Sequence, residues 1–212
     1  MTITVRRLGT TPYLETLARM RAFTRERLAN PASFGDELWL TGHPPVFTMG
    51  FASRSEHLLD TGDIPVIETE RGGQVTYHGP GQVLAYLLLD LRRRKLRVRD
   101  LVCRIEAGVI DCLAGFGVAA FRQPGAPGLY VAREQGCAKI ASIGLKVSRG
   151  FTWHGLALNA RMDLEPFTRI DPCGYPGLQM TDVAREAGTD FPADPAALAD
   201  RLAAALVDAI EG

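Results

Sequence analysis

The sequence predicts a mixed α/β fold, in which helices pack on a largely antiparallel sheet. Three strand-like runs, 129–133, 138–147 and 151–162, follow one another with short turns at Gln135-Gly136 and Arg149-Gly150, as in an antiparallel meander. Segments with helical spacing of apolar residues stand near both ends of the chain and just before the meander. A Rossmann fold is not expected, because no Gly-x-Gly-x-x-Gly joins a strand to a helix.

The composition excludes several classes of protein. With 212 residues the chain is long enough to bury a core, and its 24 basic and 24 acidic residues leave no net charge, which argues against a general nucleic-acid binder. The 22 Gly and 13 Pro are scattered among apolar segments, so disordered and collagen-like chains are excluded. The basic residues are 21 Arg and only 3 Lys, at positions 95, 139 and 146, so a lysine within an apolar segment needs a reason.

The chain is expected to be cytoplasmic, with reduced thiols. Its N-terminus lacks the apolar run of a signal peptide, and its longest apolar stretch, 83–89, is far shorter than a membrane span. The four cysteines form no Cys-x-x-Cys pair and no zinc spacing, so no metal site is expected.

The first helix is predicted over about 12–29. Thr11 is expected to cap it, Pro12 suits its first position, and Asn30-Pro31 stops it. One side of the helix, with Leu14, Leu17 and Met20 (or Ala18 and Ala22), is expected to face the core. The other side, with Arg19, Arg25 and Arg27, is expected to face water.

Short strands are predicted at 37–40 and 64–68. A longer run, 83–91, is apolar nearly throughout, as expected of a central buried strand. A helix over 99–116 follows, ended by Gly115 or Gly117, and its cysteines, Cys103 and Cys112, are expected to be small buried residues. The last helix is predicted to begin at Pro195 with Asp194 as its cap, and to bury Leu198, Leu202, Leu206 and Ile210.

The segment 71–82 is predicted to be a binding site rather than a plain turn. Its four glycines let the backbone approach a ligand closely, and Arg, Gln, Thr, Tyr and His side chains are concentrated beside them. The spacing is not that of a P-loop, because no Gly-Lys-Ser/Thr follows.

Lys139 is the lysine with an unusual position. In a regular strand it would share a face with Ala141, Ile143, Leu145 and Val147, whereas Lys146 would share the other with Ser142 and Gly144. Lys146 is therefore expected to be a solvated surface residue. Lys139 is either a snorkelling or edge residue, or an amine held in a partly desolvated pocket beside a nucleophile.

Cys173 is the candidate nucleophile, because it lies in a Pro/Gly loop without apolar periodicity and is expected to be accessible. Its reactive thiolate needs a nearby cation or helix N-terminus. Cys137, at the start of a strand, is expected to pack. Both a Cys–Lys and a Cys–His pair are open at this point, with His78 and His154 as the candidate bases, whereas His43 and His57 are expected to be structural or exposed.

Four motifs, in this order and at these spacings, resemble those of the lipoyl(octanoyl) transferases of the biotin/lipoate protein ligase superfamily: 71–82, 139–144, 154–157 and 172–174. The resemblance runs from about residue 37 to the last helix. It implies the fold of the biotin/lipoate protein ligase catalytic domain. The expected organisation is one domain over 1–212, with a core of about 30–212 and the helix of about 12–29 packed on it.

The resemblance also implies an acyltransferase with a Cys/Lys dyad at Cys173 and Lys139. The Lys139 ammonium is expected to stabilise the thiolate, which attacks the octanoyl thioester of acyl carrier protein; a lipoyl-domain lysine then takes the octanoyl (or lipoyl) group. No ATP, cofactor or metal is expected. The implied substrate-binding residues are Arg71, Gly72, Gly73, Gln74, Val75, Thr76, Tyr77, His78, Ser142, Ile143, Gly144, Gly155, Leu156 and Ala157.

The implied partners are octanoyl-acyl carrier protein, the lipoyl domains of 2-oxoacid dehydrogenase E2 subunits and the glycine cleavage H protein, without nucleic acid or membrane. The basic run 92–99 is either a solvated loop or a patch that steers acidic partners. Three alternative functions share some of the features: an ATP-dependent lipoate or biotin ligase, a non-catalytic acyl-binding protein, and a Cys–His thioesterase.

Overall fold

The computed structural model describes residues 2–191 and 195–212 and contains a main sheet of eight strands. Their order is β1-β2-β6-β10-β9-β8-β7, with β11 on β9, and only the β1–β2 and β9–β11 pairs are parallel. The prediction of a mixed, largely antiparallel sheet is confirmed. The strands are β1 (Ile3–Thr10), β2 (Asp36–Gly42), β6 (Gln82–Leu88), β7 (Ala120–Gln123), β8 (Ala126–Ala132), β9 (Cys137–Ser148), β10 (Phe151–Asn159) and β11 (Gln179–Met180).

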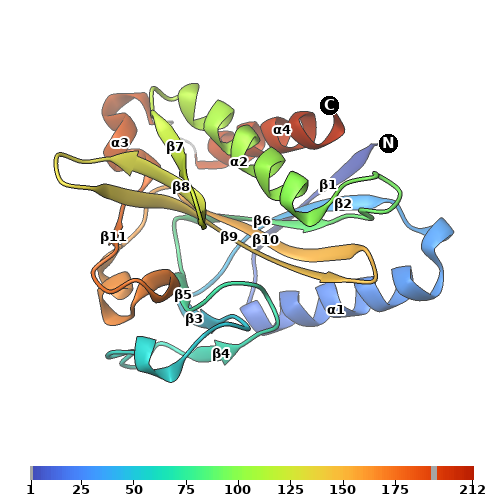
Figure 1. The fold of residues 1–212 in the computed structure, drawn as a ribbon, viewed down its shortest axis with the longest axis horizontal. Coiled ribbons are helices and arrows are strands. Elements are labelled where there is room, and N and C mark those ends of the chain that lie inside the picture. The colour runs from blue at the N-terminus through green and yellow to red at the C-terminus, as the bar shows by residue number, and fades with distance from the viewer. Residues whose placement is uncertain (1, 192–194) are drawn as a thin grey trace.

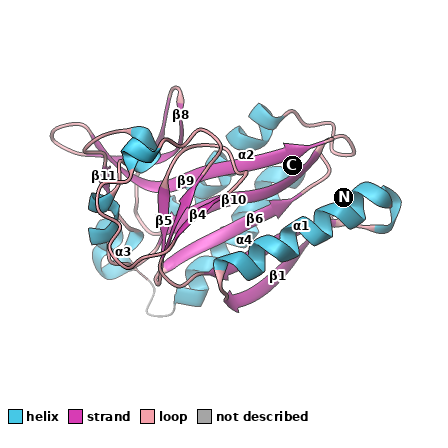
Figure 2. Ribbon diagram, turned by 90° about the horizontal axis from the view of Figure 1, so that it is seen from below, coloured by secondary structure: helices cyan, strands magenta, loops and turns pink. Residues whose placement is uncertain are grey.

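Helices cover both faces of the main sheet (Figure 1). The helices α2 (Val98–Ala114) and α4 (Pro195–Glu211) lie side by side on one face, and α1 (Tyr13–Ala29) runs along the other (Figures 1 and 2). A short helix, α3 (Val183–Ala187), follows β11. Among the helices that the structure describes, none is both long and apolar enough to cross a membrane.

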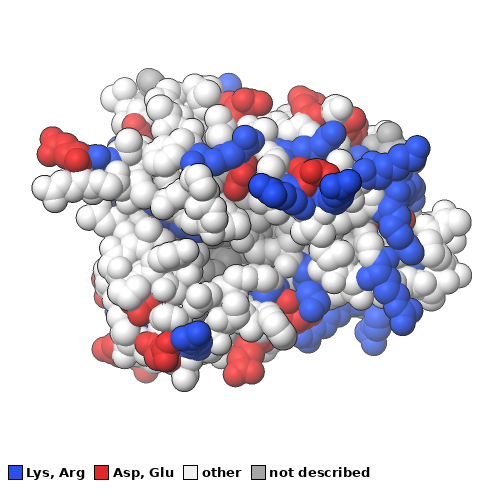
Figure 3. All heavy atoms as spheres, in the orientation of Figure 1, with Lys and Arg blue, Asp and Glu red and all other residues white. Residues whose placement is uncertain are grey.

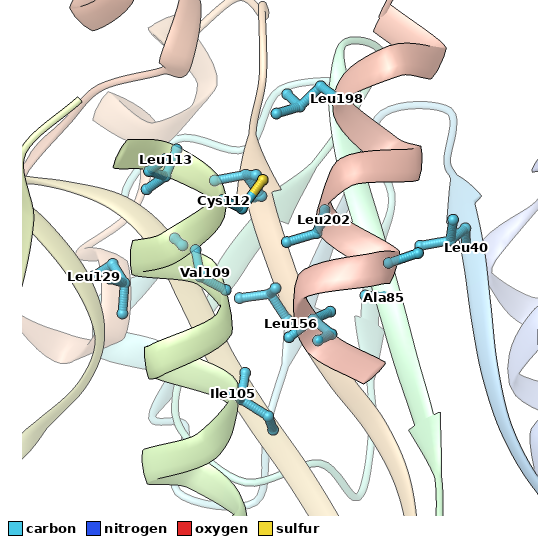
Figure 4. Packing of buried hydrophobic residues seen from close by; sticks show 14 of the residues in the cluster. Leu40, Ala85, Ile105, Val109, Cys112, Leu113, Leu129, Leu156, Leu198 and Leu202 are labelled. Carbon is cyan, nitrogen blue, oxygen red and sulfur yellow. The ribbon is translucent and has the colours of Figure 1, made fainter. Parts of the chain in front are cut away.

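The largest core lies between the main sheet and the α2–α4 pair (Figure 4). Val109 and Cys112 of α2 face Leu202 of α4 across Leu156 of β10. The predicted face of the last helix is confirmed, because Leu198, Leu202, Leu206 and Ile210 are all buried. Its predicted cap, Asp194, lies outside the described residues.

A second, smaller sheet has the order β4-β3-β5, with β3 (Val46–Met49), β4 (Val66–Glu68) and β5 (Thr76–His78). It lies on the α1 side of the main sheet (Figure 1). The strand β5 falls within the glycine-rich segment, so part of the predicted loop is extended and paired. The sequence prediction also missed β1, in which the Arg6-Arg7 pair interrupts the alternation of apolar and polar residues.

The helix α1 corrects three expectations. Pro12 is its cap residue rather than its first residue, and no side chain caps it. Leu14 is 60% exposed, whereas Arg27 is fully buried. Residue 27 lies seven positions after Met20, two helical turns along the buried face, so its guanidinium enters the protein instead of water. There it stands 4.6 Å from the centre of the Phe151 ring.

Part of the basic run 92–99 is structural. Arg93 and Arg94 both bind the buried carboxylate of Asp36, and Arg27 lies 3.6 Å from the same carboxylate. Arg94 is nearly buried, whereas Arg97 and Arg99 at the start of α2 are exposed. Arg92, Lys95, Arg97 and Arg99 are exposed and can therefore form a surface patch.

Two further expectations about single residues need correction. Cys112 is buried as predicted, but Cys103 on the same helix is exposed. Lys146 is half-buried rather than fully solvated, and its ammonium stands over the exposed ring of Phe51.

Candidate active site

A cavity of about 430 Å³ lies between the main sheet and the glycine-rich segment. Leu84, Tyr86 and Ala157 of the sheet line one side, and residues 71–74 line the other. The structure brings together nearly all of the residues predicted for the site: Arg71, Gly72, Gly73, Gln74, Thr76, His78, Lys139, Ser142, Ile143, Gly144, Gly155, Leu156, Ala157 and Cys173. Val75 and Tyr77 point instead into a small core with Phe47 and Phe167 and hold the segment in place.

Glycines at facing positions keep the cavity open. Gly144 of β9 pairs with Gly155 of β10, and a Cβ on Gly144 would meet the carbonyl oxygen of Gly72 at 2.8 Å. A side chain at residue 144 would therefore push the glycine-rich segment away from the sheet.

A bulge at Ile140 places Lys139 on the cavity face. Tyr130 of β8 pairs with Lys139, but the next residue back, Leu129, pairs with Ala141, so Ile140 is an extra residue in β9. Ile140 and Ala141 both belong to the core under α2 and α4. The prediction that Lys139 shares a face with Ala141 is therefore wrong, although the side chain is buried, being 2% exposed.

The Cys173 loop is held in an uncommon backbone conformation. Cys173 has a φ of 58° and Gly174 one of 76°, both in the left-handed region, within a short 3₁₀ turn at Pro172–Gly174. The N–H of Cys173 donates to the carbonyl of Val75 at 3.0 Å. On the other side, His57 Nδ1 lies 3.2 Å from the Asp171 carboxylate. The loop is thus fastened both to the glycine-rich segment and to the chain near residue 57.

Lys139 and Cys173 are in direct contact. The Lys139 Nζ donates to Cys173 Sγ at 3.2 Å and to the Pro127 carbonyl at 3.0 Å, and it lies 5.1 Å from the centre of the Tyr130 ring. Burial alone lowers the pKa of Lys139, but the neighbouring Cys173 and Tyr130 outweigh it and raise this pKa above its ordinary value. The site therefore holds an ammonium against a sulfur that can carry a negative charge.

The histidines contact other residues than Cys173. His78 lies 2.8 Å from Gln82 Oε1 and 3.2 Å from Thr48 Oγ1, and His154 lies 3.5 Å from Thr69 Oγ1. Burial lowers the pKa of both histidines to about 3, so both rings are neutral. His43 is buried and structural, as expected, between Thr11 and Tyr86. These rings line or support the cavity rather than flanking the thiol.

Arg71 is a second buried cation at the cavity. Its Nε donates to Thr48 Oγ1 at 3.1 Å and its Nη1 to the Gly72 carbonyl at 3.0 Å. Burial lowers the pKa of Arg71, and the nearby Tyr13 and Cys173 oppose that effect. The guanidinium thus fixes the glycine-rich segment from inside and adds positive potential to the site.

Sequence reasoning missed Tyr130, the Pro127 carbonyl and the cavity-lining residues of α1 and α2. Tyr13, Val98 and Val102 line the cavity although they lie far from the motifs along the chain. The sequence could have indicated Tyr130 only through its place on the strand next to β9. The pairing register that brings Tyr130 to Lys139 depends on the bulge.

Comparison with known proteins gives consistent matches. The model of the lipoyl protein ligase A/B catalytic domain matches residues 12–207. An octanoyltransferase of Pseudomonas entomophila is 57% identical over 184 residues, covering 87% of this chain and 82% of that protein. An octanoyltransferase of Stutzerimonas stutzeri is 54% identical over 198 residues, covering 93% and 86%.

Solved structures support the fold. The bipartite lipoate protein ligase of Thermoplasma acidophilum superposes with a TM-score of 0.74 at 13% identity, over 100% of this chain and 84% of that one. A lipoate-protein ligase A bound with ATP gives a TM-score of 0.67 at 17% identity, over 99% and 84%. The sequence matches, supported by this shared fold, show that the chain belongs to the lipoyl protein ligase A/B catalytic-domain family.

Proposed function

We propose that this protein is an octanoyltransferase that moves an octanoyl group from acyl carrier protein to a lipoyl-domain lysine through an acyl-Cys173 thioester. The observation that carries the proposal is the 3.2 Å contact between Lys139 Nζ and Cys173 Sγ at the wall of an acyl-sized cavity. Relatives at 54–57% identity named octanoyltransferase support the same chemistry. The proposed catalytic domain spans residues 1–212.

The first half-reaction transfers the acyl group to the enzyme. The Cys173 thiolate attacks the thioester carbonyl, a C–S bond to Cys173 forms, and the bond to the donor sulfur breaks. Lys139 gives its proton to the leaving thiolate, so the donor departs as a neutral thiol. The enzyme is left as octanoyl-Cys173 beside a neutral Lys139 amine.

The second half-reaction forms the amide. The lipoyl-domain lysine, having released one proton to solvent, attacks the acyl-Cys173 carbonyl as a neutral amine. A C–N bond forms, the C–S bond breaks, and Lys139 takes one of the two N–H protons. The thiolate–ammonium pair is thereby restored, and the product nitrogen keeps one hydrogen.

The cavity suits an apolar chain. Leu84, Val98, Val102, Ile143 and Ala157 supply apolar lining. Each methylene removed from water contributes about 0.8 kcal/mol to the free energy of binding, so burial of the octanoyl chain is a large part of the affinity for the acyl group. The segments proposed to bind it are 71–78, 142–144 and 155–157.

The cavity mouth is proposed to receive acidic carrier proteins, namely octanoyl-acyl carrier protein and the lipoyl domains of E2 subunits and H protein. Val98 and Tyr175 line the cavity and are also exposed, and the exposed Arg97 and Arg99 flank Val98. Figure 3 shows a hollow near the middle of this face and a gathering of Lys and Arg side chains beside it, over the β6–α2 loop and α1. A cytoplasmic location is proposed, and the four free cysteines fit it.

Charge reversal tests the docking surface. The Arg97→Glu/Arg99→Glu variant is expected to raise KM for both carrier proteins at least fivefold while leaving the saturated rate unchanged, as steering charges do. Arg201→Glu is the control, because Arg201 is exposed on α4 and donates to the Gly115 carbonyl at the far end of α2, seventeen residues, about 25 Å, from the cavity-lining Val98. Equal effects of the two changes would refute docking at the mouth.

Intact mass measurement tests the covalent step. Mixing the protein with octanoyl-acyl carrier protein is expected to add one octanoyl group, mapped to Cys173, which a lipoyl domain then removes. The adduct is expected to be absent in Cys173→Ser, whereas Cys103→Ser, the change at an exposed cysteine of α2, keeps it. Transfer by Cys173→Ser that needs ATP would instead establish a ligase.

A further inference from the structure

The side chain of Gln74 lies beside the nucleophile with an unused acceptor. A Cβ added to Gly174, the residue after Cys173, would overlap the Gln74 carboxamide, so this group lies against the Gly174 Cα. Gln74 also lines the cavity together with Lys139 and Cys173. Its Oε1 is buried and, within residues 2–191 and 195–212, has no hydrogen-bond partner. A buried acceptor without a donor is costly, which points to a donor supplied by a ligand.

The neighbouring backbone carbonyls already have partners. The Pro127 carbonyl accepts from Lys139, the Val75 carbonyl accepts from the Cys173 N–H, and the Asp171 carbonyl accepts from the Gly174 N–H. Before acylation Lys139 is protonated and acts only as a donor, so it does not accept an N–H at that stage. Gln74 Oε1 is thus a buried acceptor against the Cys173 loop that has no donor among the described residues.

We propose that the Gln74 carboxamide is a positioning group for the second half-reaction, where Oε1 accepts a hydrogen bond from the incoming lysine amine. The inference rests on the proposed function and names the residue that orients its acceptor substrate. A neutral amine has two N–H bonds and one lone pair. When one N–H points to the neutral Lys139 nitrogen and the other to Gln74 Oε1, the lone pair is left free for the acyl-Cys173 carbonyl.

This arrangement also determines which of the two amine hydrogens is transferred and which stays on the nitrogen. The C–N bond forms with the lone pair, the C–S bond breaks with its electrons on Cys173 Sγ, and the proton facing Lys139 moves to Nζ. The hydrogen held by Gln74 stays on nitrogen and becomes the amide N–H of the product. The donor substrate of the first half-reaction, a thioester, has no N–H at its reacting centre, so acylation does not use this contact.

Separate measurement of the two half-reactions tests the assignment. Gln74→Met keeps the length of the side chain and removes its acceptor. Octanoylation of Cys173, followed by rapid-quench mass spectrometry, is expected to stay within about twofold of the wild-type rate, whereas discharge by saturating lipoyl domain falls about tenfold, the effect of one hydrogen bond. Gln74→Asn, whose carboxamide is one methylene short, is expected to show the same selective loss.

Controls separate the possible outcomes. Gln135→Met makes the same chemical change at an exposed position in the turn between β8 and β9 and is expected to alter neither step. Equal losses in acylation and discharge would overturn the proposal, because a donor to the oxyanion is needed in both steps. Unchanged discharge would overturn it as well. Absence of any adduct in the wild-type protein would instead refute the proposed function.

Discussion

Removing the Cys173 charge is expected to lower the pKa of Lys139. Two influences act on this ammonium in opposite directions: burial, which favours the neutral amine, and the adjoining Cys173 with Tyr130, which favour the charged form. In the wild-type protein the second influence prevails and the pKa of Lys139 is raised. In Cys173→Ala the main opposing charge is gone, so burial decides the direction.

The geometry sets the size of the effect. At an effective dielectric constant of about 20, opposite unit charges at the 3.2 Å that separates Nζ and Sγ attract by about 5 kcal/mol. Tyr130 keeps a smaller part of the stabilisation. We therefore expect the pKa of Lys139 to fall in Cys173→Ala to below that of an ordinary lysine, because burial is then the larger influence.

The scarcity of lysine makes the measurement direct. With only 3 lysines in the chain, a protein labelled with ¹³C at lysine Cε gives three signals, from Lys95, Lys139 and Lys146. The signal missing in Lys139→Met identifies the one to titrate, and the other two report whether a substitution disturbs the rest of the protein. A Lys139 in Cys173→Ala that titrates at or above the ordinary lysine value would refute the reasoning. The same fall is expected in the octanoyl-enzyme, where Lys139 acts as the base.

Three further outcomes are expected. Shortening the donor from octanoyl to hexanoyl removes two methylenes, about 1.6 kcal/mol, and is expected to lower kcat/KM about fifteenfold in a steady-state assay; equal values for the two donors would contradict burial of the chain. Because the folded pKa of His78 and His154 is about 3 against 6.5 for a free ring, the unfolded chain binds more protons between these values. The free energy of unfolding is then expected to fall as the pH drops below 6.5, by about 2 kcal/mol per histidine at about pH 5. The His154→Asn variant is expected to lose about half of this pH dependence. Equal free energies of unfolding in urea at about pH 7 and pH 5 would refute the reasoning. Asp36→Asn is expected to reduce the free energy of unfolding in urea by about 3 kcal/mol or more, because buried guanidinium groups lose their counter-charge. Arg27→Met leaves Asp36 with its other arginines and is expected to reduce it far less. Equal losses in the two variants would refute that ranking.

Local patterns predicted those elements whose apolar periodicity is long. The helices α2 and α4, the buried strand β6 and the meander β8–β10 were all predicted from spacing and turn residues. The eight-residue strand β1 and the short strands β3 and β5 were missed because their stability comes from pairing partners far away along the chain. For the same reason Arg27 was misplaced: its burial depends on Asp36 and on the aromatic ring of Phe151, which no local pattern indicates.

The candidate site was predicted from motif and residue type, and its geometry was not. Lys139 was singled out because it interrupts an apolar strand, yet the side of the strand to which it points is set by the bulge at Ile140. Alternation assumes a regular pleat, and one extra residue reverses it. The contact of Gln74 with the Cys173 loop and the place of Tyr130 behind Lys139 depend on how three separate segments fold against one another.

The two-residue strand β11 connects the catalytic pair to the rest of the molecule. It pairs Gln179 and Met180 with Ala138 and Lys139, and the N–H of Thr181 donates to the Lys139 carbonyl at 3.0 Å. So short a ladder is broken at far smaller free energy than the core beneath α2 and α4. Heat and denaturant should therefore abolish catalysis by local opening around β11, with rapid amide exchange there, while the other strands of the main sheet are still paired.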